Sequence, residues 1–284
     1  MRILLTGAGG QLAEDLRSVL AADEVVAMTR AELDVRDRAA VLETLDRIRP
    51  ACVLNTAAFN LVDACEERCE EAFAVNALGA GNLAQAAQRA GAVMVHFSTN
   101  YVFDGAQSTP YVETDAPRPL SAYAMSKLAG EWVTQHYCEK HFVVRTAALY
   151  GSAGNRSKGG NFIERMLKQA KEGKPVRVVN DQFVNPTSTR ELAERLAPLL
   201  RSGRFGLYHM VNSGGCSWYD IAREAFRLRG VNADLAPTTT AALAAKARRP
   251  LYSVLDNRAL RQLGFADFRP WQEALASYLR ANAQ

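Results

Sequence analysis

The stretch TGAGGQLA, residues 6–13, follows directly on the apolar run 2–6 and leads into a helical pattern over 11–21. Its G-x-x-G-x-x-A spacing places Gly7 and Gly10 where the chain must turn tightly and can approach a pyrophosphate, and Ala13 is small enough for close helix packing. The phosphates would lie at the positive end of the helix dipole. A glycine-rich turn alone can be purely structural, but at the first strand-to-helix turn of a chain it predicts dinucleotide binding.

Apolar runs and helical patterns alternate through the first half of the chain. Strands are predicted at 2–6, 24–28, 52–55, 93–98 and 142–146, and helices at 11–21, 37–48, 67–90 and 122–138. Gly91 ends the third helix just before the next strand. This order implies right-handed crossovers and a parallel sheet covered on both faces, so we expect an α/β fold with a doubly wound Rossmann sheet.

After Tyr150 the pattern loosens into the glycine-rich segment 151–160, which is followed by a helix, a short strand and further helices. We expect residues 1–150 to form the NAD(P)-binding Rossmann domain, with segments at about 180–210 returning to it. Residues 151–284 would form mainly the smaller substrate-binding part. The junction of the two would then be the substrate cleft.

Composition excludes several classes of protein. The 284 residues are 48% hydrophobic and 23% charged, which is ordinary for a globular chain, and the net charge of +4 is spread along it. The charge suits an anionic ligand, and no dense basic stripe indicates nucleic-acid binding. Five scattered cysteines favour a reducing compartment, and Cys65 and Cys69 lack the further ligands of a metal site. The N-terminal apolar run is too short for a signal peptide or a membrane span, so we expect a cytoplasmic protein. No metal-ligating residues are assigned, and the sequence does not decide whether the protein requires a metal.

The end of the second strand bears on the choice of cofactor. Dinucleotide enzymes often carry an acidic residue there for the ribose 2′-hydroxyl, but this chain has Arg30. A guanidinium can pair with a 2′-phosphate, which favours NADPH over NADH, although Arg30 can equally be an exposed residue at a helix start. Asp34 is expected near the adenine, or alternatively as the cap of the helix that begins near residue 37.

Ser98 and Thr99 at the end of the fourth strand, followed by Tyr123 and Lys127, are the residues that indicate chemistry. Tyrosine and lysine four apart on a helix share one face. The lysine can lower the pKa of the phenol and anchor the nicotinamide ribose, so that Tyr123 donates its proton to a carbonyl oxygen as hydride reaches the carbon. Thr99 can bond the same oxygen, and Ser98 is expected on the cofactor side. After a dinucleotide-binding turn, this order predicts a carbonyl reductase.

Eight strings in this order span nearly the whole chain: TGAGGQLA (6–13), NTAAFNLVD (55–63), VNALGAGNLA (75–84), STNYVFDG (98–105), SAYAMSKLAGE (121–131), RTAALYG (145–151), NDQFVNPT (180–187) and RRPLYSVLD (248–256). Together they resemble the dTDP-4-dehydrorhamnose reductases, members of the extended short-chain dehydrogenase/reductases. The resemblance implies reduction of dTDP-4-dehydro-L-rhamnose at C4 to dTDP-L-rhamnose, with NADPH or NADH as cofactor. We expect a dTDP-sugar as partner, no nucleic acid or membrane, and a monomer or a homodimer.

The resemblance also assigns roles by position. It implies a catalytic threonine, tyrosine and lysine at Thr99, Tyr123 and Lys127. Implied cofactor contacts are the pyrophosphate turn and the residues that line the nicotinamide side or lie on the long helix: Gly7, Gly10, Gln11, Leu12, Ala57, Ala58 and Asn76. Asn76 could instead be a simple polar helix residue. Asn161 and Phe162 match the segment that approaches the substrate nucleotide, and Arg249 with Pro250 could be structural or could contact a ligand.

Departures from the family pattern concern the sugar. Phe59 and Asn60 replace the usual His-Thr or Tyr-Thr pair, Asn100 replaces an aspartate, and Ala148 replaces a tryptophan. With Tyr101, these residues are expected at the substrate, and Phe59 could supply part of the surface lost at Ala148. A reductase of a different nucleotide-linked 4-keto-6-deoxyhexose is therefore an alternative. Less favoured alternatives are an epimerase-like enzyme with tightly held NAD and a non-catalytic dinucleotide-binding regulatory subunit.

Overall fold

A six-stranded parallel sheet forms the centre of the computed structural model, which describes residues 1–153 and 159–282. Its strands run in the spatial order β10 (Gly206–His209), β5 (His141–Thr146), β4 (Val93–Thr99), β3 (Cys52–Asn55), β1 (Arg2–Thr6) and β2 (Glu24–Met28). The order reverses between β1 and β3, so the carboxyl ends of these strands open a crevice of the kind that binds ligands in such sheets. The predicted α/β fold class is confirmed, and each predicted strand agrees with the observed one to within a residue.

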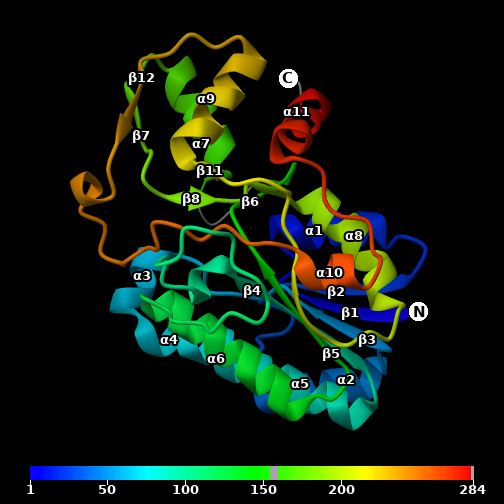
Figure 1. Cartoon of the computed structure of the whole chain (residues 1–284). Coiled ribbons are helices and arrows are strands. Elements are labelled where there is room, and N and C mark those ends of the chain that lie inside the picture. The colour runs from blue at the N-terminus through cyan, green and yellow to red at the C-terminus, as the bar shows by residue number, and fades with distance from the viewer. Residues whose placement is uncertain (154–158, 283–284) are drawn as a thin grey trace.

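Helices cover both faces of the sheet (Figure 1). Ile3 and Leu5 point to one face and pack with α1 (Gln11–Val19), α8 (Thr189–Leu200) and α10 (Arg258–Gln262). Leu4 and Val53 point to the other face, where α2 (Arg38–Ile48) and α5 (Gly79–Ala90) lie, and α6 (Ala122–Tyr137) packs beside α5. The alternation of apolar side chains along each strand therefore supplies two separate cores.

The helix predicted over 67–90 is confirmed from residue 69 onward, but it contains a π-helical turn that was not predicted. It consists of α4 (Cys69–Phe73), the π-helical turn η1 (Ala74–Leu78) and α5, and a separate short helix, α3 (Val62–Glu67), precedes it. Asn76 lies in this widened turn, and its side-chain amide both accepts from the Phe59 N–H at 2.9 Å and donates to the Phe59 carbonyl at 3.1 Å. The π turn therefore aims a polar side chain at the loop that follows β3. Gly91 ends α5 in the left-handed region, as predicted.

A smaller part lies over the carboxyl edge of the sheet (Figure 1). It contains α7 (Phe162–Lys171), α9 (Trp218–Arg229) and α11 (Trp271–Ala281), with the parallel pair β7 (Val176–Val179) and β12 (Leu235–Thr238). Two short pairs join it to the rest: β6 (Leu149–Tyr150) with β9 (Thr187–Ser188), and β8 (Phe183–Val184) with β11 (Cys216–Ser217). The short helices η2 (Asn100–Val102) and η4 (Ala241–Leu243) complete the described elements.

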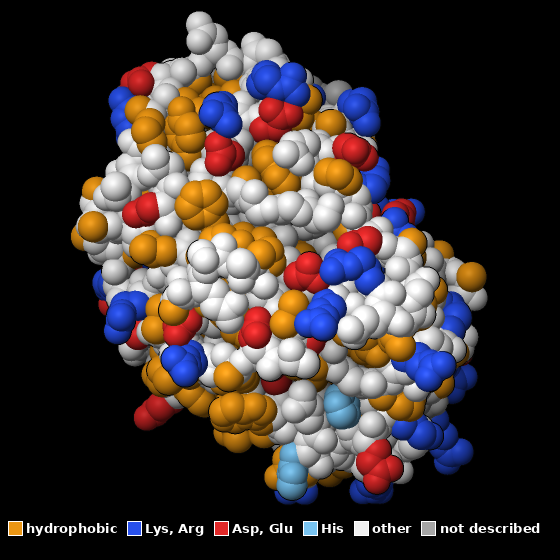
Figure 2. Space-filling view, in the orientation of Figure 1, with side chains coloured by type: hydrophobic (Ala, Val, Ile, Leu, Met, Phe, Trp, Pro, Cys, Tyr) orange, Lys and Arg blue, Asp and Glu red, His pale blue; other side chains and the backbone are white. Residues whose placement is uncertain are grey.

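The chain returns from this smaller part to the sheet through α8, which packs against α1, and β10, which extends the sheet beside β5. The division at residue 150 stays a prediction, and residues 154–158 of the glycine-rich segment lie outside the described residues. Acidic and basic side chains intermingle on the face drawn in Figure 2, without a basic stripe there. Among the described helices, none is both long and apolar enough to cross a bilayer.

Candidate active site

The glycine-rich turn after β1 has the geometry that a pyrophosphate requires. Gly7 adopts φ +73°, and a Cβ on it would lie 2.6 Å from the backbone nitrogen of Ala57, so only glycine fits. Gly10 is the N-cap of α1 and offers no side chain to the free N–H groups of the first turn, and Gly9 faces open space. These donors are left for a ligand, and the turn therefore fits a dinucleotide.

The other residues predicted to contact the cofactor near this turn differ in how their side chains are buried. Gln11 lines the adjoining cleft, donates from Nε2 to the carbonyl of Leu149 at 3.0 Å, and its Oε1 is buried with no hydrogen-bond partner in the described part of the chain. Leu12 packs into the core, so only its backbone can reach a ligand. Ala57 is half-buried and Ala58 is exposed beside it. An orphaned amide oxygen next to free helix N–H groups is what a bound polar cofactor would satisfy.

Arg30 follows the end of β2 with a side chain that is 66% exposed. It lies between two carboxylates, 3.7 Å from Asp34 and 3.8 Å from Glu71, and neither contact is a close ion pair. Asp34 instead forms a tight paired contact with Arg36, which lowers the pKa of its carboxyl to about 2. Asp37, which accepts from the Ala40 N–H, caps α2, so the alternative of Asp34 as that cap is wrong. Arg30 thus remains available to an anion.

Thr99 ends β4 and Tyr123 lies in the first turn of α6, and both residues line the same cleft. Thr99 also caps η2 by accepting from the Tyr101 N–H at 3.2 Å, which fixes its side chain. The ring of Tyr101 meets that of Tyr123 edge to face, with centroids 6.2 Å apart. Burial raises the pKa of Tyr123 above its usual value, whereas we expected Lys127 to lower it. A phenol in this environment stays protonated at neutral pH and can serve as a proton donor.

Lys127 lies one turn further along α6 and is almost fully buried, with 3% of its surface exposed. Burial lowers the pKa of its ammonium to about 8. Its Nζ lies 3.4 Å from Nε2 of His96, a buried residue of β4. Sequence reasoning missed His96, although a single histidine within an apolar strand, just before Ser98 and Thr99, was a usable signal.

The hydroxyl of Ser98 donates a hydrogen bond to the carboxylate of Glu131 at 2.5 Å, and Glu131 in turn forms an ion pair with Arg145 of β5. This buried group lies behind the end of β4. No role was predicted for Glu131 or Arg145, although both lie in strings that carry the family resemblance. Asn76 is also fully buried and is occupied by Phe59 and by the hydroxyl of Ser126, at 2.9 Å. Cofactor contacts of Ser98 and Asn76 therefore stay predictions.

A cleft of about 670 Å³ lies between the carboxyl edge of the sheet and the smaller part of the molecule. It brings together most of the residues predicted at the reaction and the substrate: Ser98, Thr99, Tyr123, Asn60, Asn100, Tyr101, Ala148, Asn161 and Phe162. Phe59 is not among its lining residues, because its ring lies against the guanidinium of Arg68, 4.9 Å away. The surface expected from Phe59 is thus missing from this cleft.

Two of the predicted substrate residues have side chains that already make internal contacts. Asn100 donates to the hydroxyl of Ser253 at 2.7 Å. Asn161 caps α7 in a capping box with Glu164 and donates to the hydroxyl of Tyr278. These two side chains would contact a ligand through the free acceptor sites of their amide oxygens or through the shape they give the cleft wall.

Charged residues that the sequence patterns left unassigned also line the cleft. Arg249, left open between a structural and a ligand role, pairs with Asp63 through its two terminal guanidinium nitrogens, at 3.0 and 2.7 Å, and its charge interacts with the hydroxyl of Tyr101. Arg177 lines the cleft and pairs with Asp234, and Arg165 lies on the wall formed by α7. Arg249 and Arg177 are thus already paired, whereas Arg165 has no carboxylate within ion-pairing distance among the described residues and leaves a positive charge in the cleft that suits an anionic substrate such as a nucleoside diphosphate sugar.

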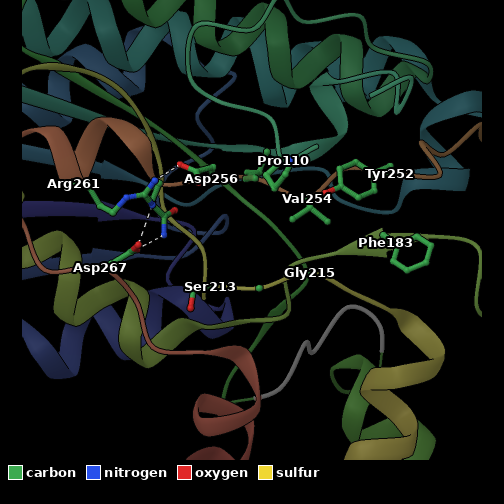
Figure 3. A pocket seen from close by; sticks show the side chains of 12 residues that line it. Pro110, Phe183, Ser213, Gly215, Tyr252, Val254, Asp256, Arg261 and Asp267 are labelled. Atoms are coloured by element: carbon green, nitrogen blue, oxygen red, sulfur yellow. Dashed lines mark hydrogen bonds and ion pairs between the residues drawn. The ribbon is translucent and has the colours of Figure 1, made fainter. Parts of the chain in front are cut away.

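A second cavity, of about 200 Å³, lies away from these residues (Figure 3). Phe183, Tyr252 and Val254 form its apolar side, and at its other end Arg261 is already paired with Asp256 and Asp267. Its charges are internally neutralised and it holds no reactive group, so the larger cleft is the candidate active site. Within the described residues, no three His, Cys, Asp or Glu side chains gather as metal ligands.

Comparison with known proteins agrees with this geometry. The RmlD substrate binding domain family matches residues 1–283. A dTDP-4-dehydrorhamnose reductase of Streptomyces griseus is 40% identical over 283 residues, covering 96% of this chain and 91% of that protein. A dTDP-4-keto-6-deoxy-D-glucose reductase of Streptomyces niveus is 38% identical over 278 residues, covering 96% and 95%.

Among solved structures, a dTDP-4-dehydrorhamnose reductase from Bacillus anthracis str. Ames in complex with NADP superposes with a TM-score of 0.95. It is 34% identical, and the match covers 99% of each chain. The similarity in fold and in sequence thus extends over nearly the whole chain. The chain belongs to the RmlD substrate binding domain family.

Proposed function

We propose that this protein is an NADPH-dependent dTDP-4-dehydrorhamnose reductase, which reduces the C4 keto group of dTDP-4-dehydro-L-rhamnose to give dTDP-L-rhamnose. The observation that carries the proposal is that Thr99 and Tyr123 line the same large cleft, with Lys127 one helical turn behind Tyr123. The name of the Streptomyces griseus relative supports the choice of substrate.

The residues of the chain divide the chemistry among themselves. Thr99 and Tyr123 donate hydrogen bonds to the keto oxygen and orient it, and Tyr123 transfers its phenolic proton to that oxygen as negative charge develops there. Because burial keeps the pKa of Tyr123 high, the proton is present at neutral pH. Lys127, one turn away, stabilises the phenolate that remains. NADPH, when bound, supplies the hydride.

The preference for NADPH rests on Arg30. Its guanidinium is exposed, lies beyond β2 and is only loosely held by Asp34 and Glu71, so it can turn toward a 2′-phosphate. The NADP in the Bacillus anthracis relative supports the same choice.

A second candidate keeps the cofactor and changes the sugar. Asn100 donates a hydrogen bond to Ser253, Ala148 contributes no indole at its position on the cleft wall, and the Streptomyces niveus relative is named for dTDP-4-keto-6-deoxy-D-glucose. A reductase of another dTDP-linked 4-keto-6-deoxyhexose would use the same catalytic residues.

A panel of nucleotide-linked 4-keto sugars tests both candidates. We expect NADPH oxidation to be fastest with dTDP-4-dehydro-L-rhamnose, with dTDP-L-rhamnose identified as product by NMR. A faster reaction with another keto sugar would favour the second candidate. No oxidation with any of them, in a protein that binds NADPH, would contradict the proposal and indicate a binding subunit.

A further inference from the structure

His96 of β4 lies between the cofactor turn and the catalytic helix, and it is completely buried. Its Nδ1 lies 3.3 Å from Nδ2 of Asn55 at the end of β3, and its Nε2 lies 3.4 Å from Nζ of Lys127. The helix approaches this closely because residue 130 is glycine: a Cβ there would lie 2.8 Å from Nε2 of His96. The imidazole is therefore held on both sides.

The direction of the hydrogen bond between Asn55 and His96 follows from the backbone N–H of Ala57, which can only donate. The backbone N–H of Ala57 points at Oδ1 of Asn55 at 3.2 Å, and the hydroxyl of Thr6 donates to the same oxygen at 2.9 Å. The NH₂ group of Asn55 must then face His96. Because that group only donates, Nδ1 of His96 is the acceptor and carries no proton, and a neutral ring carries its proton on Nε2.

The protonated Nε2 faces Lys127. An ammonium has three donors and no acceptor, so it cannot accept from Nε2–H, whereas a neutral amine can. We propose that His96 is a positioning residue that sets the protonation equilibrium of Lys127, because its Nε2–H favours the neutral amine over the ammonium. The chain Thr6–Asn55–His96–Lys127 thus links the dinucleotide-binding turn to the catalytic lysine.

The other titratable groups around Lys127 do not reverse this preference. Glu131, on the same helix, raises the pKa of Lys127, but its carboxylate is already paired with Arg145 of β5. Burial of His96 lowers the pKa of its ring well below the usual value, so the ring stays neutral. Cys65 of α3 and Tyr101 of η2 face Tyr123, not Lys127. The π turn η1 has no titratable side chain. The titratable side chains of α4 and α5 lie at or near the surface: Cys69, Glu70, Glu71 and Arg89.

The consequence for catalysis rests on the proposed reduction. After Tyr123 has given its proton to the keto oxygen, a phenolate remains and must be reprotonated. A lysine that releases a proton close to neutral pH can supply it: the N–H bond of Lys127 breaks, the O–H bond of Tyr123 forms, and Lys127 regains a proton from solvent. An ordinary lysine, with a pKa near 10.4, would hold that proton more firmly.

NMR on the whole protein without cofactor or substrate tests the proposal. In the unsubstituted protein, ¹⁵N shifts of the His96 ring should report a proton on Nε2; a proton on Nδ1 would overturn the inference without any mutation. The ¹³Cε resonance of Lys127, identified by its loss in Lys127→Met, should titrate near pH 8.

In His96→Gln, whose amide oxygen can turn toward the ammonium, the titration midpoint of Lys127 should rise by at least about one pH unit. His209→Gln, which changes another fully buried histidine, is the matched control and should leave the midpoint unchanged. An unchanged or lower midpoint in His96→Gln would also overturn the inference. Because these measurements need no sugar, they stand even if the proposed substrate is wrong.

Discussion

Glu131 and Arg145 form a buried, bidentate ion pair directly behind the end of β4, which carries Ser98 and Thr99. Arg145 donates from Nε and Nη2 to the two carboxylate oxygens of Glu131, at 2.9 and 2.7 Å. The side chain of Arg145 is only 4% exposed and that of Glu131 only 1%. The hydroxyl of Ser98 adds a third donor to the same carboxylate. The pair thus ties α6, which carries Tyr123 and Lys127, to β4 and β5.

Removing one charge of this pair should cost much of the stability of the fold. Glu131→Gln leaves the guanidinium of Arg145 buried without a counter-charge, and we expect the free energy of unfolding to fall by about 3–5 kcal/mol. Urea denaturation followed by circular dichroism measures it. Glu194→Gln, in the exposed pair with Arg190, is the control and should cost less than about 1 kcal/mol. Equal losses in the two variants would show that the buried pair has no special role.

Tyr123→Phe should separate folding from chemistry. The variant keeps the ring and its contact with Tyr101 but loses the proton donor, so turnover should fall by about a hundredfold or more while cofactor affinity changes little. Turnover and fluorescence titration with NADPH provide the two measurements. Tyr137→Phe, at the exposed end of the same helix, should be fully active. Full activity in Tyr123→Phe would mean that another group is the acid.

The depressed pKa of Lys127 predicts a pH dependence of stability. Its ammonium has a pKa of about 8 in the folded protein and about 10.5 in the unfolded chain, so the unfolded chain binds more protons between these values. The cost of burying the charge is fully present below pH 8 and disappears as the pH rises toward 10.5.

The difference in unfolding free energy between the natural protein and Lys127→Met should therefore rise across this window, by at most about 1.4 kcal/mol per pH unit. The tyrosines titrate in both proteins, so their contribution to the unfolding free energy cancels in this difference. A flat difference from pH 8 to 10.5 would show that Lys127 has an ordinary pKa.

The elements that the sequence predicted well are those with local signals. Apolar runs bounded by glycine or helix caps located β1, β2 and β3 to the residue. The π turn η1 was not predictable in this way, because apolar periodicity does not record a change in hydrogen-bond spacing. Within that turn, Asn76 is hydrogen-bonded to Phe59, which lies 17 residues earlier in the chain.

The residues of the candidate site also differ in whether a local sequence signal marks them. The placement of Thr99 and Tyr123 in one cleft, with Lys127 one helical turn away, was predictable because the spacing of these residues is itself the signal, and their catalytic roles stay a proposal. His96, Glu131 and Arg145 act through partners on other elements, which only the folded chain brings together. The expected lowering of the Tyr123 pKa was wrong for a related reason: it considered the neighbouring charge and not the burial of the ring, which dominates.

Arg30→Ala should change cofactor preference. We expect the affinity for NADPH to fall by roughly tenfold, the low end for a charge-assisted contact because the side chain is exposed, with little change for NADH. Dissociation constants for both cofactors measure it. Arg36→Ala is the matched control, since that guanidinium is already committed to Asp34. Equal affinities of the natural protein for NADPH and NADH would contradict the assignment.

The space beside Ala148 predicts how the sugar is held. Ala148 lines the cleft with φ +41°, a conformation that is strained for any residue with a Cβ, so a larger side chain adds volume without adding much backbone strain. Phe59 is turned away toward Arg68 and does not fill the space from the other wall. In Ala148→Trp the indole should therefore pack against bound sugar and lower the Michaelis constant for dTDP-4-dehydro-L-rhamnose by about two- to tenfold.

Ala148→Leu is the control for Ala148→Trp, since it adds aliphatic volume without an aromatic face and should give a smaller gain. Steady-state kinetics with the same keto sugar compares the three forms. A higher Michaelis constant in Ala148→Trp, with a family-typical value in the natural protein, would show that the natural sugar already fills this part of the cleft. Tighter binding of a bulkier keto sugar by the natural protein than by Ala148→Trp would instead identify that sugar class as the substrate, because only the open wall at Ala148 admits it.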